Sequence, residues 1–502
     1  MKKRLLFLSL FLILLTSAGK SVAAVSMTLE QYIREILLNN HSLRAGVKSV
    51  EADYYSVLSA VGTQRPALAA TAGGNWVSHQ GNESGYTAAN LGLALTHRID
   101  ISGKYSLDER QRILGYEVSR AKFDANLNTL ISTAEQTWWS AVLARENVRL
   151  QKEVLTQRSE NHRVTMEKYR QELVPRLDIV RSEAQVVQAE SQVKEAETTY
   201  QNLLANLSFL AGGMDVEPEE QELRVPEFDV EVNYDDALAF RPDVRSARLS
   251  VERAKLVKKL TARGLSPTLD FSAQWTAWSD PETTNSVPKK GEAAAGLSLK
   301  LPIFDGHQTK YGVLNADRLI QSAESSLESL KEQTRRDIAV ALNNWKNASA
   351  VEVDRKRQVE RAKEELHITE LMYSEGMGAQ IDLINAQVSY RSVSTEYLAA
   401  VRDMYVALVE LRQAMGDYAP DEDGTWREAV TRYGKGNDIL GEVGLKSLRD
   451  PRIQLEEKDS AKKAGSDIVP AVKPFGVPPA SREEVAEIKA SLQKIYQERG
   501  IE

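Results

Sequence analysis

Residues 269–276, LDFSAQWT, and residues 296–303, GLSLKLPI, alternate between apolar and polar or small side chains. Residues 91–96, LGLALT, show the same period of two earlier in the chain. Successive side chains of a β-strand point to opposite faces, so this alternation predicts strands with one apolar face. This pattern fits a membrane strand, with one face to lipid and one to water, and it also fits a soluble sheet with one buried face. The surrounding sequence must decide between these two interpretations.

Very long helices are predicted on the carboxyl side of these strands. The first is expected at residues 104–172 and the second at residues 308–375. At a rise of about 1.5 Å per residue each would reach roughly 100 Å, far more than a globular domain needs. The shorter helices expected at 28–64 and 175–210 would together match the first long helix end to end. The sequence therefore predicts an elongated, mainly helical protein with a small β part.

The same order of elements is written twice along the chain. Short helix, two strands, long helix and short helix recur, with second-copy helices expected at 235–263, 308–375 and 379–415. Matching residues are 201 positions apart at the start of the copies and 204 apart at the end. The pairs are Arg44 and Arg245, Pro66 and Pro267, Leu68 and Leu269, Tyr169 and Tyr373, Asp178 and Asp382, and Gly212 and Gly416. A constant offset indicates one structural unit used twice.

The chain begins with a predicted signal peptide at residues 1–24. A basic segment, Lys2 to Arg4, precedes an apolar run that is too short to span a bilayer, and small residues follow up to Ala24. The remaining organisation is then expected as follows: first repeat 25–216, linker 217–232, second repeat 233–416, and a charged, proline-containing tail 417–502 with a short helix near 481–499.

Composition excludes several functions. The 502 residues carry a net charge of −7 and no cysteine. There is no basic surplus for nucleic acid, and disulfides, thiolate metal sites and a cysteine nucleophile are ruled out. The six histidines lack the close helical spacing of a metal site, and no catalytic motif is present. We therefore expect no cofactor and no enzymatic activity.

The number of strands bears on the assembly. Two copies supply four strands, whereas known single-chain membrane barrels begin at about eight. Open sheet edges cannot face lipid, so in a membrane these strands must be completed by other protomers. A different class stays open at this point: a trimeric periplasmic coiled-coil tether or adhesin without a conduit would share the long helices and secretion.

Short motifs in the second copy resemble those of the TolC-like outer-membrane efflux protein family. They are FRPDV at 240–244, LPIFDG at 301–306, YSEG at 373–376 and IDLINAQ at 381–387. The resemblance covers about residues 28–416. It implies a homotrimer with a shared twelve-stranded barrel in the lipid of the outer membrane and a trimeric α-barrel across the periplasm. It also implies partners: a periplasmic adaptor (membrane fusion) protein and an inner-membrane pump of the RND, ABC or MFS type.

The candidate site residues lie near the helix-to-helix tips. Asp178 and Asp382 are expected in the first turn of a returning helix, where a carboxylate meets the positive end of the helix dipole. The resemblance implies that Asp382 narrows a periplasmic entrance and favours cations there. Family members often carry an acidic residue at Asn385 and a basic one at Gly378, so this acidic ring should be weaker. The other candidates are Tyr373, Arg176 and Arg181 at the gate, and Ser298 and Lys300 facing the barrel lumen.

Overall fold

The computed structural model of the protein describes residues 25–77, 86–220, 234–278 and 290–418. The expected signal peptide, the helix near 481–499 and nearly all of the linker lie outside the described residues. Within the described ranges, no helix is both long enough and apolar enough to cross a membrane.

Helices dominate the described chain, as the sequence predicts. In order they are α2 Leu29–Asn39, α3 His41–Gly62, α4 Lys104–Arg170, α5 Arg176–Leu210, α6 Tyr234–Phe240, α7 Pro242–Ala262, α8 Gln308–Ser374 and α9 Gln380–Met415. The strands are β1 Val25–Met27, β2 Ala67–Val77, β3 Tyr86–Ile99, β4 Val216–Pro218, β5 Thr268–Trp278 and β6 Lys290–Lys300. The expected class, mainly α with a small β part, is confirmed.

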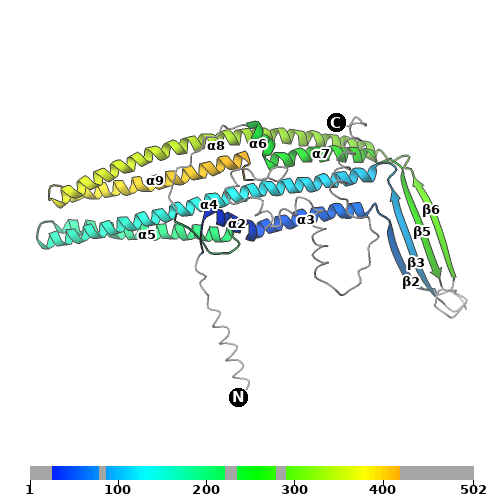
Figure 1. Ribbon diagram of the computed structural model, residues 1–502, viewed down its shortest axis with the longest axis horizontal. Coiled ribbons are helices and arrows are strands. Elements are labelled where there is room, and N and C mark those ends of the chain that lie inside the picture. The colour runs from blue at the N-terminus through cyan, green and yellow to red at the C-terminus, as the bar shows by residue number, and fades with distance from the viewer. Residues whose placement is uncertain (1–24, 78–85, 221–233, 279–289, 419–502) are drawn as a thin grey trace, which may run out of the picture. The chain divides into compact units, whose positions relative to one another are not determined.

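The long helices α4 and α8 have 67 residues each, which corresponds to about 100 Å. Helices α3 and α5 both pack on α4, one on the side of the strands and one on the side of the tips (Figure 1). Helices α7 and α9 are arranged in the same way between α4 and α8. Each short helix pair therefore lies along one long helix, which agrees with the lengths expected from sequence.

The single helix expected at 28–64 is wrong at Asn40, where the backbone leaves the helical region (φ −64°, ψ 121°) and separates α2 from α3. The Asn40 side-chain oxygen accepts a hydrogen bond from the Leu43 N–H at 2.9 Å. Its amide nitrogen donates to the carbonyl of Leu210, the last residue of α5, also at 2.9 Å. Asparagine competes with the helix for such bonds, which explains the break.

The single second-copy helix expected at 235–263 is divided at the corresponding position, between α6 and α7. Helix α7 begins at Pro242, after Arg241 in an extended conformation (φ −63°, ψ 123°). Proline suits a first helical position because its missing N–H has no partner there in any case.

Four strands form one antiparallel sheet in the order β2-β3-β5-β6. Leu93 and Leu95 pair with Trp275 and Ala273, and Leu297 pairs with Phe271, so the apolar side chains share one face. Strand β6 ends at Lys300, three residues before the expected end at Ile303, because Pro302 has no N–H to donate to a ladder. A small parallel sheet of β1 and β4 was not expected from the sequence.

The main core lies where the short helices meet along α4. Trp138 is fully buried and stacks on Tyr32 of α2, with ring centroids 5.1 Å apart. The neighbouring Trp139 stacks on Tyr405 of α9 at 3.9 Å. Trp345 of α8 is also buried. All three tryptophans therefore pack in this core.

Candidate functional site

The two helix-to-helix tips have closely similar backbones. Glu172 and Gly376 occupy equivalent positions and both adopt left-handed φ angles, 59° and 74°. At each tip the following N–H donates to a carbonyl five residues earlier: Leu173 to Lys168, and Met377 to Met372. These bonds satisfy carbonyls left open at a helix end, so α4 and α8 stop in the same way.

Asp178 and Asp382 are each the third residue of a returning helix, as the sequence predicts. The residues before these helices, Pro175 and Ala379, supply no side-chain hydrogen bond to the helix start. A carboxylate in the first turn stabilises such an end through the helix dipole. Both aspartates therefore have a local structural role, whatever else they do.

The two aspartates differ in their surroundings. The Asp178 side chain is 16% exposed and lies 3.9 Å from the Arg181 guanidinium, measured from Oδ1 to Nη1. Asp382 is exposed and forms no ion pair within the described residues. Asn385 is exposed one turn later, and Arg176 is exposed at the start of α5. Of the two aspartates, the one without an ion pair within the described residues is therefore that of the second copy.

Tyr373 is buried rather than presented to solvent, with 8% of its surface exposed. The Lys168 ammonium lies over its ring, 4.0 Å from the centroid, and donates a hydrogen bond to the Tyr373 carbonyl at 3.1 Å. This pairs a cation with both the ring face and the carboxyl end of α8. Lys168 ties the two tips of the protomer together, and sequence reasoning missed it.

A second tie runs through Gln380, the first residue of α9. Its side-chain nitrogen donates to the Thr165 hydroxyl of α4 and to the Asp178 carbonyl of α5, each at 3.3 Å. Gln380 is 7% exposed, so these bonds are largely shielded from water. Three helix ends meet at this one amide.

The sheet separates apolar from polar side chains. Leu297 and Leu299 are 66% and 65% exposed on one face. On the other face Ser298 pairs in register with Asp270, which lies 3.9 Å from Arg98, and Lys300 pairs with Thr268. Within the described residues the outer edges of β2 and β6 pair with no strand. This sheet has one face suited to lipid and one suited to water.

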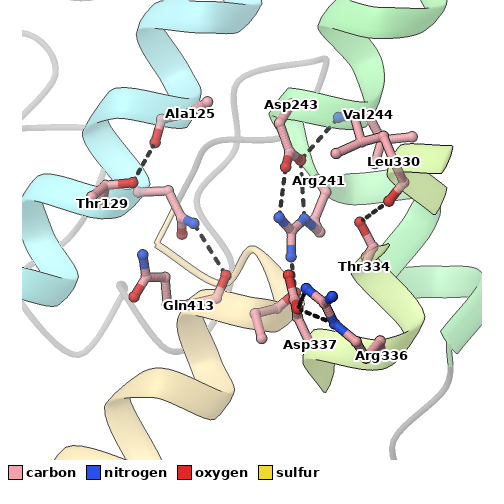
Figure 2. Close-up of polar contacts among 12 residues, drawn as sticks. Ala125, Thr129, Arg241, Asp243, Val244, Leu330, Thr334, Arg336, Asp337 and Gln413 are labelled. Carbon is pink, nitrogen blue, oxygen red and sulfur yellow. Dashed lines mark hydrogen bonds and ion pairs between the residues drawn. The ribbon is translucent and has the colours of Figure 1, made fainter. Parts of the chain in front are cut away.

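An open polar groove of about 650 Å³ lies between α4, α7, α8 and α9. Figure 2 shows Arg241 bridging Asp243 and the end of α9, with Arg336 and Asp337 opposite on α8. Each of these arginines is paired with its neighbouring aspartate. In the described part of the chain, no group of three metal-ligating side chains comes together.

The fold therefore combines long paired helices that end in tied tips with a four-stranded sheet that has one apolar and one polar face. The family model "Outer membrane efflux protein" matches residues 32–213 and again residues 233–417. The chain therefore belongs to the outer membrane efflux protein family. Family membership makes it an outer-membrane channel protein with its helices extending into the periplasm, and the family is one of channels rather than enzymes.

Individual relatives are distant but cover most of the chain. Nodulation protein T of Rhizobium leguminosarum bv. viciae is 22% identical over 80% of this chain and 85% of its own. Outer membrane protein TolC of Escherichia coli K12 is 23% identical over 81% and 85%. The CmeC outer membrane channel of Campylobacter jejuni has a TM-score of 0.72 at 19% identity, covering 81% of this chain and 89% of that one. The resemblance to TolC-like channels is confirmed.

Proposed function

We propose that this protein is the outer-membrane exit duct of a tripartite efflux or type I secretion system and conducts its substrates passively. The observation that carries the proposal is the pairing of a two-faced strand sheet with helices about 100 Å long in one protomer. Membership of the efflux family supports it. A tether or adhesin needs neither the lipid-facing strands nor the tied tips.

The functional unit is a homotrimer. Four strands per chain with two open edges cannot lie in lipid, because unpaired backbone groups there cost several kcal/mol each. Three chains supply twelve strands, within the range of closed outer-membrane barrels. Ser298 and Lys300 then face the lumen, while Leu297 and Leu299 face lipid.

A passive duct needs partners that supply energy and deliver substrate. We assign these roles to an inner-membrane pump of the RND, ABC or MFS type and to a periplasmic adaptor protein. The three pump classes would use the same conduit, because substrate choice and energy would lie in the pump. The tips of α4–α5 and α8–α9 are the parts of this chain that would face them.

The gate lies at the tips, with Asp382 as the main charge and Asp178 assisting. Threefold symmetry brings three exposed Asp382 carboxylates together, while Asp178 is partly neutralised by Arg181. Separated like charges gain by sharing one cation, so the ring favours and holds cations. Tyr373 acts through Lys168, which fixes one tip against the other, and Arg176 and Asn385 border the entrance.

The gate is tested by D382N, which keeps a polar group at the helix start but removes the charge. Single-channel currents in planar bilayers measure cation preference and block by multivalent cations. We expect block by multivalent cations to weaken about fivefold. Two unit charges near 4 Å in water attract by about 1 kcal/mol, which corresponds to that factor. N385D should strengthen block, and D178N should have the smaller effect. Unchanged selectivity and block in a folded D382N trimer would place the gate elsewhere, whereas a folded trimer without conductance would favour a tether.

The facing of the strands is tested by arginine substitutions on β6. Arginine at Leu297 should cost about 2–4 kcal/mol if the site lies near the middle of the bilayer, and arginine at Ser298 should cost little. The measurement is the fraction of assembled trimer in outer membranes. Equal tolerance of the neighbouring substitutions L297R and S298R would show that the faces are assigned the wrong way or that no lipid contact exists.

A further inference from the structure

A buried arginine without a carboxylate partner lies inside the helical bundle, above the tips. Arg158 of α4 is 2% exposed, and its Nη1 donates to the backbone carbonyl of Gln185 on α5 at 3.1 Å. Its Nε and Nη2 are buried and have no hydrogen-bond acceptor in the described structure. A buried charge normally has a charged or strongly polar partner, so these two unpaired nitrogens of Arg158 require an explanation.

Nε and Nη2 form the edge of the guanidinium that arginine uses to bind two oxygens at once. Elsewhere in this chain, Arg241 uses Nε and Nη2 to hold both oxygens of Asp243, at 3.0 and 2.6 Å. Arg402 presents the same two nitrogens to Asp403 at 3.0 and 2.7 Å. The spacing of these donors matches a carboxylate or a phosphate. In Arg158 these two nitrogens have no hydrogen-bond acceptor among the described residues.

A second arginine faces the same region from α9. Hydrogen bonds from Gln151 to Thr395 and from Gln380 to Thr165 fix α4 and α9 in antiparallel register. Arg158 lies midway between Gln151 and Thr165, so it lies within about one turn of Arg391 on α9. Burial, together with the positive charge of Arg391, lowers the pKa of Arg158 below its usual range.

Arg391 has its own unsatisfied donor. Its Nε is buried without an acceptor in the described part of the chain. Ser394, one turn further along α9, is 6% exposed, and its hydroxyl is also unpartnered there. No described Asp or Glu lies within 4.0 Å of either guanidinium. Two cations and a hydroxyl therefore lie in one region, and no described carboxylate forms an ion pair with either cation.

We propose that Arg158 and Arg391, with the Ser394 hydroxyl, form a binding site for one small oxyanion between α4, α5 and α9. The ligand chemistry is that of inorganic phosphate or a small carboxylate: two oxygens on the Arg158 edge and a third contact on α9. The donors are covered, so the ion enters only as the contact between α4 and α9 loosens. Exchange should accordingly be slow, and the bound ion should hold these helices together.

The test is binding of radiolabelled inorganic phosphate to the full-length, detergent-solubilised protein by equilibrium dialysis at constant ionic strength. We expect one phosphate per chain, with binding lost in R158M and in R391M. R158K keeps the charge but lacks the two-nitrogen edge, and should bind about tenfold more weakly. R163M is the matched control on the same helix, because Arg163 is exposed and already paired with Glu160 and Glu167. It should bind like the unaltered protein.

Competition and melting separate the remaining possibilities. Sulfate or acetate should displace phosphate at lower concentration than chloride does, because chloride cannot use both nitrogens. Phosphate should raise the Tm of the unaltered protein, and R158M should abolish that shift while remaining folded. No bound phosphate, or equal binding by R158M, would overturn the proposal and leave water as the partner of these donors. Neither outcome depends on conduction, so the proposed duct function stands or falls separately.

Discussion

The two copies of the structural unit build the same junction with different chemistry. In the first copy Asn40 separates the short helices and donates to the Leu210 carbonyl at the end of α5. In the second, Arg241 lies at the equivalent position and donates to the Ala414 carbonyl near the end of α9, at 2.9 Å. Both bonds satisfy carbonyls that a helix end leaves open. Duplication has kept the geometry of the junction and exchanged the side chain that makes it.

The two junctions also differ in the helix that covers them. Helix α2 has 11 residues and buries Tyr32, Ile33, Ile36 and Leu37 over the first junction. Helix α6 has only 7 residues, and the open polar groove remains at the second junction (Figure 2). The first junction is therefore covered by apolar side chains, whereas at the second the Arg241–Asp243 pair borders an open groove.

The largest expected contrast is between Arg245 and its counterpart Arg44. Arg245 is 12% exposed and paired with Asp124, which is 9% exposed. Arg44 in α3 is exposed, and among the described residues it donates only to the Leu38 carbonyl and the Asn39 side chain at the end of α2. R245M should destabilise by about 3–5 kcal/mol because it removes the arginine that pairs with a buried carboxylate, and R44M should destabilise by less than about 0.5 kcal/mol. The two variants are compared by thermal unfolding, monitored by far-UV circular dichroism.

A control isolates the charge from the packing at this pair. The double variant D124L/R245M removes both charges and should recover most of the stability lost in R245M. If the double variant is as unstable as R245M alone, packing rather than the ion pair holds α7 on α4.

An intermediate contrast is expected at the junctions. R241M removes a two-bond ion pair of a side chain that is 16% exposed, together with the bond to Ala414, and should cost about 2–4 kcal/mol. N40A removes one cap and one bond to Leu210, and should cost about 1–2 kcal/mol. The same melting experiment ranks the two variants. A reversed order would show that the second junction does not depend on its charges.

The smallest effect concerns the starts of the long helices. Gly103 and His307 precede α4 and α8 with nearly identical left-handed angles, φ 71° and 68°. Only glycine adopts these angles without strain, so H307G should stabilise by up to about 1 kcal/mol. The readout is the melting temperature of the helical signal.

Two alanine variants check the cause. H307A loses the ring contact with Phe304 but keeps the strain, and should show no gain. G103A should destabilise although a Cβ there meets nothing within 4 Å, because only the backbone angle is affected. A gain in H307A equal to that in H307G would attribute the effect to the ring instead.

Much of the architecture could be predicted because its signals are local. Alternation in 269–276 fixes which side chains share a face, and Pro242 fixes the start of α7. The break at Asn40 was missed because asparagine within a helical stretch is ambiguous until Leu210 lies beside it. Strand β6 ends at Lys300, earlier than expected, because Pro302 lacks an N–H, and this signal was present in the sequence.

At the tips the sequence located the positions but not the contacts. Asp178 and Asp382 could be placed from the repeat, and the residue three positions later, Arg181 or Asn385, is the local difference between the paired aspartate and the unpaired one. The contacts between the tips have no such local signal. Lys168 and Gln380 are ordinary surface residues until partners 205 and 215 positions away meet them.

Local sequence patterns were enough to predict the duplicated order of elements, the approximate length of the long helices and the two faces of the sheet, because each depends on neighbours within a few residues. Only the packing of the helices decided how the tips are tied and that Arg158 is buried without a carboxylate partner among the described residues. Those features arise where α4, α5, α8 and α9 pack, and burial is a property of that packing rather than of any one segment. From the sequence alone, a buried guanidinium such as that of Arg158 cannot be distinguished from a solvated charge on a long helix.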